Sequence, residues 1–303
     1  MPYISGQELF QWYQTVSQQA EHYDISPLEI QMLITELTNI DALEYKLRSY
    51  QQKPQIKSQV TIDQLNDLWE KRTGDRTPIQ YLLGKCYWRD FCFQVTPDVL
   101  IPRPETELII DLVENIIHRQ SKLQQGNLLD LGTGSGAIAI ALAKLLGENT
   151  PHQVFAVDRS EDALKIAQQN ASKYNVNSQI VFAHGSWFEP IKGASNRHSF
   201  SVIVSNPPYI PSDVVTQLQP EVVNHEPKMA LDGGADGLDD IRQIISQSVD
   251  FLKPEGFVIL EMMSGQGERV KQLFIENGNY DRIEIHYDFA NHDRFVSAQK
   301  IKG

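Results

Sequence analysis

The stretch "LLDLGTGSGAIAIALA" at residues 128–143 predicts a buried strand, a glycine turn and a helix in succession. Gly132, Gly134 and Gly136 allow a tight turn and let a ligand approach the backbone without obstruction from Cβ atoms. The helix N-terminus beyond the turn offers free N–H groups, which favours a nucleoside-type cofactor over a bare strand-to-helix turn. The spacing also fits the looser dinucleotide fingerprint, so the glycines alone leave the cofactor's identity open.

Apolar segments alternate with helical patterns from residue 127 onward, which predicts a doubly wound, parallel sheet in an α/β fold. The expected strands are "NLLDL", "QVFAVD", "QIVFA", "FSVIVS" and "GFVILEM", and the helices lie near 137–147, 160–173, 237–252 and 266–277. Two further strands, "RIEIHYD" and "RFVSAQK", are joined by a loop too short for a parallel crossover, so they should pair antiparallel. A mostly parallel seven-stranded sheet with an antiparallel C-terminal hairpin is typical of methyltransferases that use S-adenosylmethionine.

The first part of the chain shows a different pattern. Residues 1–75 carry apolar side chains at helical spacing, and Ser26 with Pro27 marks the start of a helix. The aromatic stretch "YWRDFCFQV" at 87–95 predicts a short β-hairpin, and a proline-rich linker follows it. We therefore expect a small N-terminal helical domain at 1–85, a β-hairpin and linker at 86–103 and the α/β domain at 104–303. Pro104 is expected at the first position of a helix.

Composition narrows the class of protein. The 303 residues carry a formal net charge of −12, which argues against a protein that binds by neutralising phosphates. Cys86 and Cys92 are too few for a disulfide framework or a zinc cluster. The N-terminus lacks the features of a signal peptide, and the longest apolar run is too short to span a bilayer. These features predict a cytoplasmic protein with no membrane segment.

Two positions after the next strands are candidates for cofactor binding. Asp158 ends the second strand roughly 20 residues beyond the last glycine, where an acidic residue can bond ribose hydroxyls. It could instead belong to the acidic start of the next helix, and we favour the ribose role because of its place at the strand end. Trp187 follows the third strand and is either ordinary core or an aromatic flank for an adenine ring.

The stretch "SNPPY" at 205–209 ends the fourth strand, at the edge where open parallel sheets bind ligands. Pro207 and Pro208 lack N–H groups and are held extended, so this segment offers acceptors almost exclusively. Asn206 Oδ1 and the Pro207 carbonyl can each accept one hydrogen of an –NH2 group, and Tyr209 can pack on its flat face. The segment therefore predicts a socket for an amino or amide group, with a rigid turn as the simpler alternative.

The acidic, glycine-rich stretch "LDGGADGLDD" at 231–240 does not fit a calcium-binding loop. Gly234 stands where a ligand is needed, and Gln243 stands where the pattern requires glutamate. We interpret it as a loop leading into a helix. The eight histidines show no metal-binding spacing, so we expect no metal.

The chain resembles the HemK family, the release-factor glutamine N5-methyltransferases. The matching stretches are "TPIQYLLG", "VLIPRPETE", "DLGTGSGAIAIALA", "AVDRS", "GSWF", "VSNPPYIP", "HEPKMALDGGADGL" and "GQG" at 265–267. The resemblance implies methyl transfer from S-adenosylmethionine, with S-adenosylhomocysteine as product, to the glutamine of the Gly-Gly-Gln motif in peptide chain release factors. We also expect a monomer that has no direct contact with nucleic acid.

The resemblance assigns roles by position. The cofactor's methionine part would be held by Gly132, Thr133, Gly134, Ser135 and Gly136. Asp158 would hold the ribose, Trp187 would border the adenine, and Asn206 would lie against the cofactor as well as the substrate. Asn206, Pro207, Pro208 and Tyr209 would clamp the glutamine, with Asn206, Pro207 and Tyr209 catalytic. Ser186 departs from the family's usual aspartate before the tryptophan, so a carboxylate contact to the adenine amino group is not expected.

Three other functions use similar elements. An adenine-N6 nucleic-acid methyltransferase needs the same –NH2 socket, but the acidic charge and the lack of a basic recognition insert argue against it. A non-catalytic nucleotide-binding module has no use for the socket. A nicotinamide dehydrogenase fits the glycine spacing but leaves "NPPY" unexplained.

Overall fold

The computed structural model describes residues 2–120, 123, 126–147, 150–193 and 196–302, and it divides into two compact units. The first unit comprises residues 1–84 and 220–225, and the second comprises residues 85–219 and 226–303. The chain therefore leaves the second unit at residue 220, contributes one short helix to the first, and returns at residue 226.

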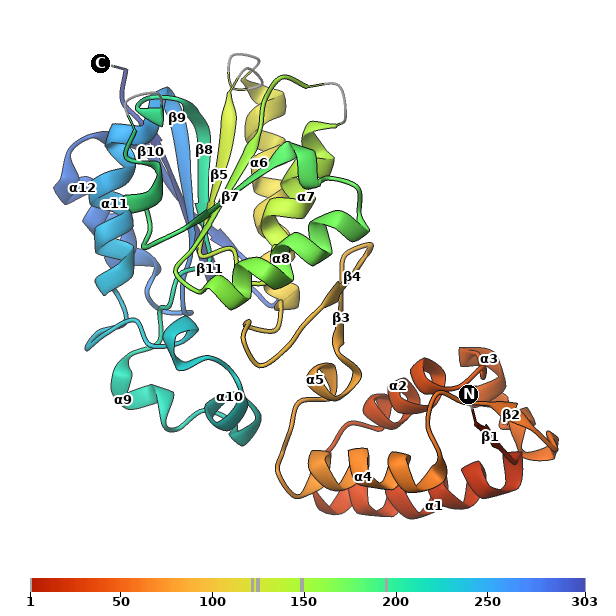
Figure 1. The fold of residues 1–303 in the computed structure, drawn as a ribbon. Coiled ribbons are helices and arrows are strands. Elements are labelled where there is room, and N and C mark those ends of the chain that lie inside the picture. The colour runs from red at the N-terminus through yellow and green to blue at the C-terminus, as the bar shows by residue number, and fades with distance from the viewer. Residues whose placement is uncertain (1, 121–122, 124–125, 148–149, 194–195, 303) are drawn as a thin grey trace. The chain divides into compact units, whose positions relative to one another are not determined.

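The second unit is built on a seven-stranded sheet in the order β10-β11-β9-β8-β5-β6-β7 (Figure 1). The neighbours from β9 to β7 pair parallel, whereas β11 pairs antiparallel with both β9 and β10. The predicted fold, a doubly wound and mostly parallel sheet with an antiparallel C-terminal hairpin, is confirmed. The strands are β5 Asn127–Leu131, β6 Val154–Asp158, β7 Ile180–His184, β8 Phe200–Ser205, β9 Leu252–Glu261, β10 Tyr280–Tyr287 and β11 Asp293–Lys300.

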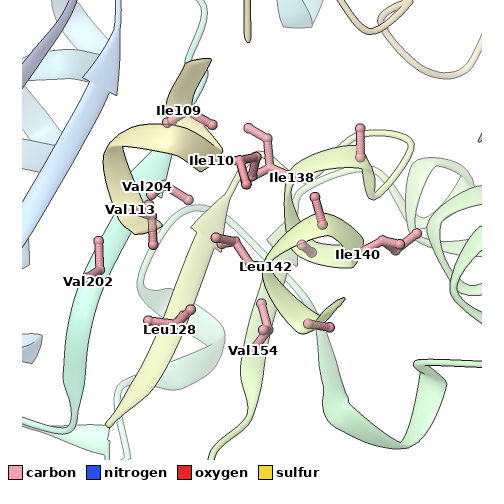
Figure 2. Packing of buried hydrophobic residues seen from close by; sticks show 14 of the residues in the cluster. Ile109, Ile110, Val113, Leu128, Ile138, Ile140, Leu142, Val154, Val202 and Val204 are labelled. Carbon is pink, nitrogen blue, oxygen red and sulfur yellow. The ribbon is translucent and has the colours of Figure 1, made fainter. Parts of the chain in front are cut away.

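Helices cover both faces of this sheet, because the strands are apolar on both sides. Leu128 packs with one buried cluster and its neighbour Leu129 with another, as expected from the alternation of side chains along a strand. Figure 2 shows the first cluster, in which Ile109 and Val113 of α6 and Leu142 of α7 meet the sheet. The helices are α6 Leu108–Arg119, α7 Ala137–Leu146, α8 Glu161–Lys173, α11 Asp239–Phe251 and α12 Gly267–Asn277.

A hairpin and several short turns complete the second unit. The predicted hairpin forms between β3 and β4, and the Trp88 indole donates to the Arg103 carbonyl at 2.9 Å. Pro104 opens a 3-10 turn, and α6 itself begins at Leu108; neither element has a side-chain cap. The bounds are β3 Lys85–Trp88, β4 Phe91–Gln94, η2 Pro104–Glu107, η4 Asn177–Gln179, η5 Glu189–Ile191, α9 Ser212–Val215 and η7 Lys228–Ala230.

The first unit is helical, as predicted, around its own apolar core. The helix expected after Ser26 begins at Pro27, and the Ser26 hydroxyl accepts from the Leu28 N–H at 3.3 Å. A two-residue strand pair near the N-terminus was not predicted, because segments that short carry no periodicity. The elements are β1 Tyr3–Ile4, α1 Gly6–His22, α2 Pro27–Leu37, α3 Ala42–Leu47, η1 Ser49–Gln52, β2 Ile56–Lys57, α4 Ile62–Thr73, α5 Ile79–Leu83 and α10 Pro220–His225.

A buried arginine binds α10 to the rest of the first unit. Arg72 of α4 is 5% exposed and donates to Glu29 Oε1 at 3.0 Å and to Glu221 Oε1 at 2.9 Å. Arg76 also pairs with Glu221, at 2.6 Å. Because a buried guanidinium stays charged, these carboxylates are required to compensate its burial.

We predict that Arg72→Met destabilises the protein by about 3 kcal/mol, since it leaves Glu29 and Glu221 without their buried partner. Urea unfolding measures the change in the free energy of unfolding. Lys165→Met is the control, because Lys165 and Asp162 are each 62% exposed and such pairs contribute about 1 kcal/mol or less. Equal effects of the two substitutions would contradict the role of Arg72 as an anchor.

Candidate active site

A pocket opens at the carboxyl edge of the sheet and gathers side chains from four strand ends. Residues from the predicted set that line it are Gly132, Gly134, Asp158, Trp187, Asn206 and Pro208. The first two follow β5, Asp158 ends β6, Trp187 follows β7, and the last two follow β8. Parallel strands bring these positions together because all of their carboxyl ends lie at one edge.

The glycine turn divides into a pocket-lining part and a supporting part. Gly132 and Gly134 line the pocket with φ angles of +74° and +53°, which favour glycine. Gly136 has a φ of +84°, and a Cβ there would lie 3.0 Å from the Ala167 Cβ, so it permits close packing of α7 on α8. Thr133 and Ser135 are buried, at 6% and 3% exposure. Direct contact of these three supporting residues with a cofactor stays a prediction.

Asp130 supports the turn from beneath and was not singled out from the sequence. Its Oδ2 accepts from the Thr133 hydroxyl at 2.6 Å and from the Ala139 N–H at 3.2 Å. Oδ1 has no hydrogen-bond partner among the described residues. Burial raises the pKa of Asp130 to about 7, and the charge of Asp158 acts in the same direction. A carboxylate inside the apolar strand "NLLDL" was the available signal.

Asp158 lies at the start of α8 and lines the pocket, and its ribose role stays a prediction. Its Oδ2 accepts from the Gly134 N–H and its Oδ1 from the Ser160 N–H, each at 2.8 Å. It therefore ties the glycine turn to the start of α8 and also lines the pocket. Burial raises the pKa of Asp158 despite these bonds. Each carboxylate oxygen keeps a lone pair, so it can accept further from a vicinal diol.

Trp187 has an unusual backbone conformation at the edge of the pocket. Its φ is +47°, which is strained for a bulky side chain, and its indole N–H donates to Asp240 Oδ1 at 3.1 Å. A Cβ built on Gly132 would lie 3.6 Å from the indole ring, so the ring sits directly over the glycine turn. Ser186 lines the same pocket. Asp240 was not predicted, because its place at a helix start carries no sequence signal for this contact.

The segment after β8 is held by side-chain hydrogen bonds. Asn206 Nδ2 donates to the Thr106 hydroxyl at 3.2 Å, which leaves Oδ1 as the end of the amide that can accept from a ligand. The Tyr209 hydroxyl donates to Glu261 Oε1 at 3.2 Å. Burial raises the pKa of the Tyr209 hydroxyl, and the Glu261 carboxylate raises it further, so the phenol stays protonated.

The acidic, glycine-rich stretch at 231–240 braces this segment. The Ile210 N–H donates to the Leu231 carbonyl at 3.0 Å, and the Gly233 N–H returns a bond to the Ile210 carbonyl at 2.9 Å. Gln266 Nε2 donates to the Tyr209 carbonyl at 2.9 Å. The stretch thus supplies backbone partners for the segment that carries Asn206. Within the described residues, no group of three His, Cys, Asp or Glu side chains could hold a metal ion.

Comparisons with known proteins identify the family. A family model described as a methyltransferase domain matches residues 122–288. The chain is 43% identical over 303 residues to a release factor glutamine methyltransferase of Synechocystis sp., covering 99% of this chain and 98% of that protein. It is 42% identical to one from Thermosynechococcus vestitus, covering 98% and 99%. The chain belongs to the release factor glutamine methyltransferases.

The fold of this family member also matches a solved structure. The catalytic domain of hMettl16, in complex with the MAT2A 3′UTR hairpin 6, aligns with a TM-score of 0.54 at 12% identity and covers 88% of each chain. At that identity the likeness concerns the fold alone. In the part of the methyltransferase that the structure describes, we find no helix with the length and apolar character needed to span a bilayer.

We predict that Gly237→Ala destabilises the enzyme by at least about 2 kcal/mol more than Gly278→Ala. Both glycines have a φ of +75°, so both substitutions carry the cost of a left-handed alanine. A Cβ at 237 would also lie 2.3 Å from the Tyr209 carbonyl oxygen, whereas the position at 278 is open. Thermal unfolding of both variants measures the difference. Equal shifts in the unfolding temperature would show that the Tyr209 backbone can move away from residue 237.

Proposed function

We propose that this chain transfers a methyl group from S-adenosylmethionine to the side-chain amide nitrogen (N5) of the glutamine in the Gly-Gly-Gln motif of peptide chain release factors. The observation that carries the proposal is the acceptor-only segment at the pocket edge, where Asn206 turns its Nδ2 away to Thr106. Family membership supports the same reaction. We further propose that the enzyme works as a cytoplasmic monomer without direct contact to nucleic acid.

The pocket suits S-adenosylmethionine. The bare backbone at Gly132 and Gly134 accommodates the methionine part, and the Asp158 carboxylate can accept from both ribose hydroxyls. Trp187 presents an aromatic surface for the adenine. When bound, the cofactor supplies an electrophilic methyl group on a positively charged sulfur. Burial raises the pKa of Asp158 although the charge of Arg159 lowers it, and a cationic ligand would favour the ionised carboxylate further.

The socket addresses the low nucleophilicity of an amide, whose nitrogen lone pair is delocalised. Asn206 Oδ1 and the Pro207 carbonyl accept the two amide hydrogens, so they stabilise the positive charge that develops on nitrogen during methyl transfer. They also fix the direction of the lone pair. Tyr209 packs on the flat face of the amide, and its bond to Glu261 holds the ring in place. Once alkylated, the nitrogen is acidic and loses its proton without a strong base.

We predict that Asn206→Ala lowers the single-turnover rate about a hundredfold or more, since the lost contact strengthens in the transition state. The affinity for S-adenosylhomocysteine, measured by calorimetry, should change far less. A release factor with Asn or Glu at the tip tests the socket's geometry, because Asn is one methylene short and ionised Glu has no –NH2. A near-normal rate for Asn206→Ala would show that the segment is only a rigid turn.

Acceptor identity requires its own test. The enzyme is incubated with labelled S-adenosylmethionine and either a release factor or duplex DNA. We expect label in the release factor, lost when its tip Gln is replaced. Label in DNA instead would favour the adenine-N6 alternative, which uses the same kind of socket.

We propose that the N-terminal helical region, residues 1–85, recognises the release factor, because a small pocket alone cannot select one glutamine among many. Leu43 and Leu47 of α3 are 65% and 69% exposed. They are four residues apart, so they share one face of the helix. Exposed leucines grouped in this way are a candidate contact for an apolar patch on the factor.

We predict that the double variant Leu43→Ser/Leu47→Ser raises KM for the intact release factor about tenfold, with little change in kcat. Methylation of a short Gly-Gly-Gln peptide should be unaffected, because the peptide lacks the apolar patch that would contact this face. Ile275→Ser in α12, at a residue that is 52% exposed, serves as the control. An unchanged KM for the intact factor would contradict this role.

A further inference from the structure

Two buried polar residues lie directly behind the acceptor segment. Thr106, from the 3-10 turn before α6, is 4% exposed, and Glu261, the last residue of β9, is 1% exposed. Neither residue is among those that line the pocket beside Asn206 and Pro208. Such groups are buried at a cost unless they are hydrogen-bonded, so their contacts point to a role.

The side chains of Asn206 and Tyr209 both form hydrogen bonds with this pair. Asn206 Nδ2 donates to the Thr106 hydroxyl, and the Tyr209 hydroxyl donates to Glu261 Oε1, each at 3.2 Å. Glu261 Oε2 has no hydrogen-bond partner among the described residues. Burial raises the pKa of Glu261 to about 7, and the neighbouring Thr106 hydroxyl is the largest influence in the opposite direction.

The direction of these bonds follows from the chemistry of each group. The Thr106 hydroxyl accepts from Asn206 Nδ2, so its single proton can turn to the Glu261 carboxyl beside it, and a hydroxyl in that state needs a donor from Asn206. The Asn206 amide can donate to the hydroxyl through Nδ2 but not through Oδ1. The chain of bonds therefore selects the orientation in which Oδ1 faces away from Thr106. The flipped amide would place two acceptors against each other and would aim an N–H at the –NH2 of the substrate.

A nearby arginine favours the ionised form of Glu261. The positive charge of Arg294 lowers the pKa of this carboxyl, and Glu105 acts more weakly in the opposite direction. Arg294 is held by Asp288, whose Oδ2 accepts from its Nη2 at 3.2 Å. The backbone beside it is also fixed, because the Met262 N–H donates to the Arg294 carbonyl at 3.0 Å.

We propose that Thr106 and Glu261 are positioning residues that fix the Asn206 amide with Oδ1 toward the acceptor nitrogen. The inference rests on the proposed function, because it assigns Asn206 Oδ1 to the methyl acceptor. Neither residue touches the substrate. Their contribution should therefore appear in the rate of methyl transfer rather than in the binding of cofactor or release factor.

The test compares Thr106→Val, which removes the hydroxyl at similar volume, with Thr106→Ser, which keeps it. We expect Thr106→Val to lower the single-turnover rate at least tenfold, with the affinity for S-adenosylhomocysteine within about twofold of wild type. Thr106→Ser should stay within about threefold of the wild-type rate. Glu261→Gln, which can donate as well as accept, should slow turnover like Thr106→Val while leaving KM for the release factor unchanged.

A double-mutant cycle separates positioning from a general structural role. If Thr106 acts through Asn206, then Thr106→Val should have little further effect in the Asn206→Ala background. An equal fold-loss in both backgrounds would overturn the proposal. So would a wild-type rate for Thr106→Val, or equal losses for Val and Ser at this position. Should Thr106→Val fail to fold in a thermal melt, Glu261→Gln carries the same cycle with Asn206→Ala.

The two proposals fail separately. A wild-type enzyme that transfers no label to the release factor would overturn the proposed function. A wild-type enzyme that methylates the factor, with variants that keep its rate, would overturn the positioning role alone.

Discussion

The site depends on a segment that cannot donate hydrogen bonds through its prolines. Pro207 and Pro208 contribute carbonyls but no N–H groups, so this part of the chain cannot be held as an ordinary strand. Donors from elsewhere must reach its carbonyls and side chains. Gln266 reaches the Tyr209 carbonyl, and a Cβ at Gly233 would lie 2.7 Å from the Pro208 carbonyl oxygen. The glycine-rich stretch at 231–240 and the "GQG" turn at 265–267 therefore together hold the segment "NPPY" in place.

Buried carboxylates form the second layer of the site. Asp130 supports the glycine turn and Glu261 supports the socket, and burial raises the pKa of each to about 7. Buried acids are unfavourable in a protein with nothing to compensate them. A cationic ligand, such as the sulfonium that we propose, would favour the ionised form of these acids and would lower their pKa.

The sequence predicted the sheet and the pocket because both follow from local patterns. Apolar segments that alternate with helical patterns locate the strands. Parallel strands then bring Asp158 and Asn206 to one edge of the sheet. The supporting residues could not be found in this way. Thr106 precedes Asn206 by 100 residues, and inside "PETE" it reads as part of a helix start. Glu261 stands inside the predicted strand "GFVILEM", where the sequence gives no sign of its partners. Contacts between distant segments depend on tertiary packing, which periodicity does not encode.

The same hydrogen-bond logic explains why the socket uses an amide. The side chain at 206 must donate toward Thr106 and accept toward the substrate, and Asn206 has one group of each kind. A carboxylate there would present acceptors on both sides, and one would face a hydroxyl whose proton is directed to Glu261. An aliphatic side chain would leave Thr106 without its donor and the substrate without its acceptor. The choice of asparagine thus follows from the buried Thr106 hydroxyl behind it as much as from the substrate amide that we propose in front of it.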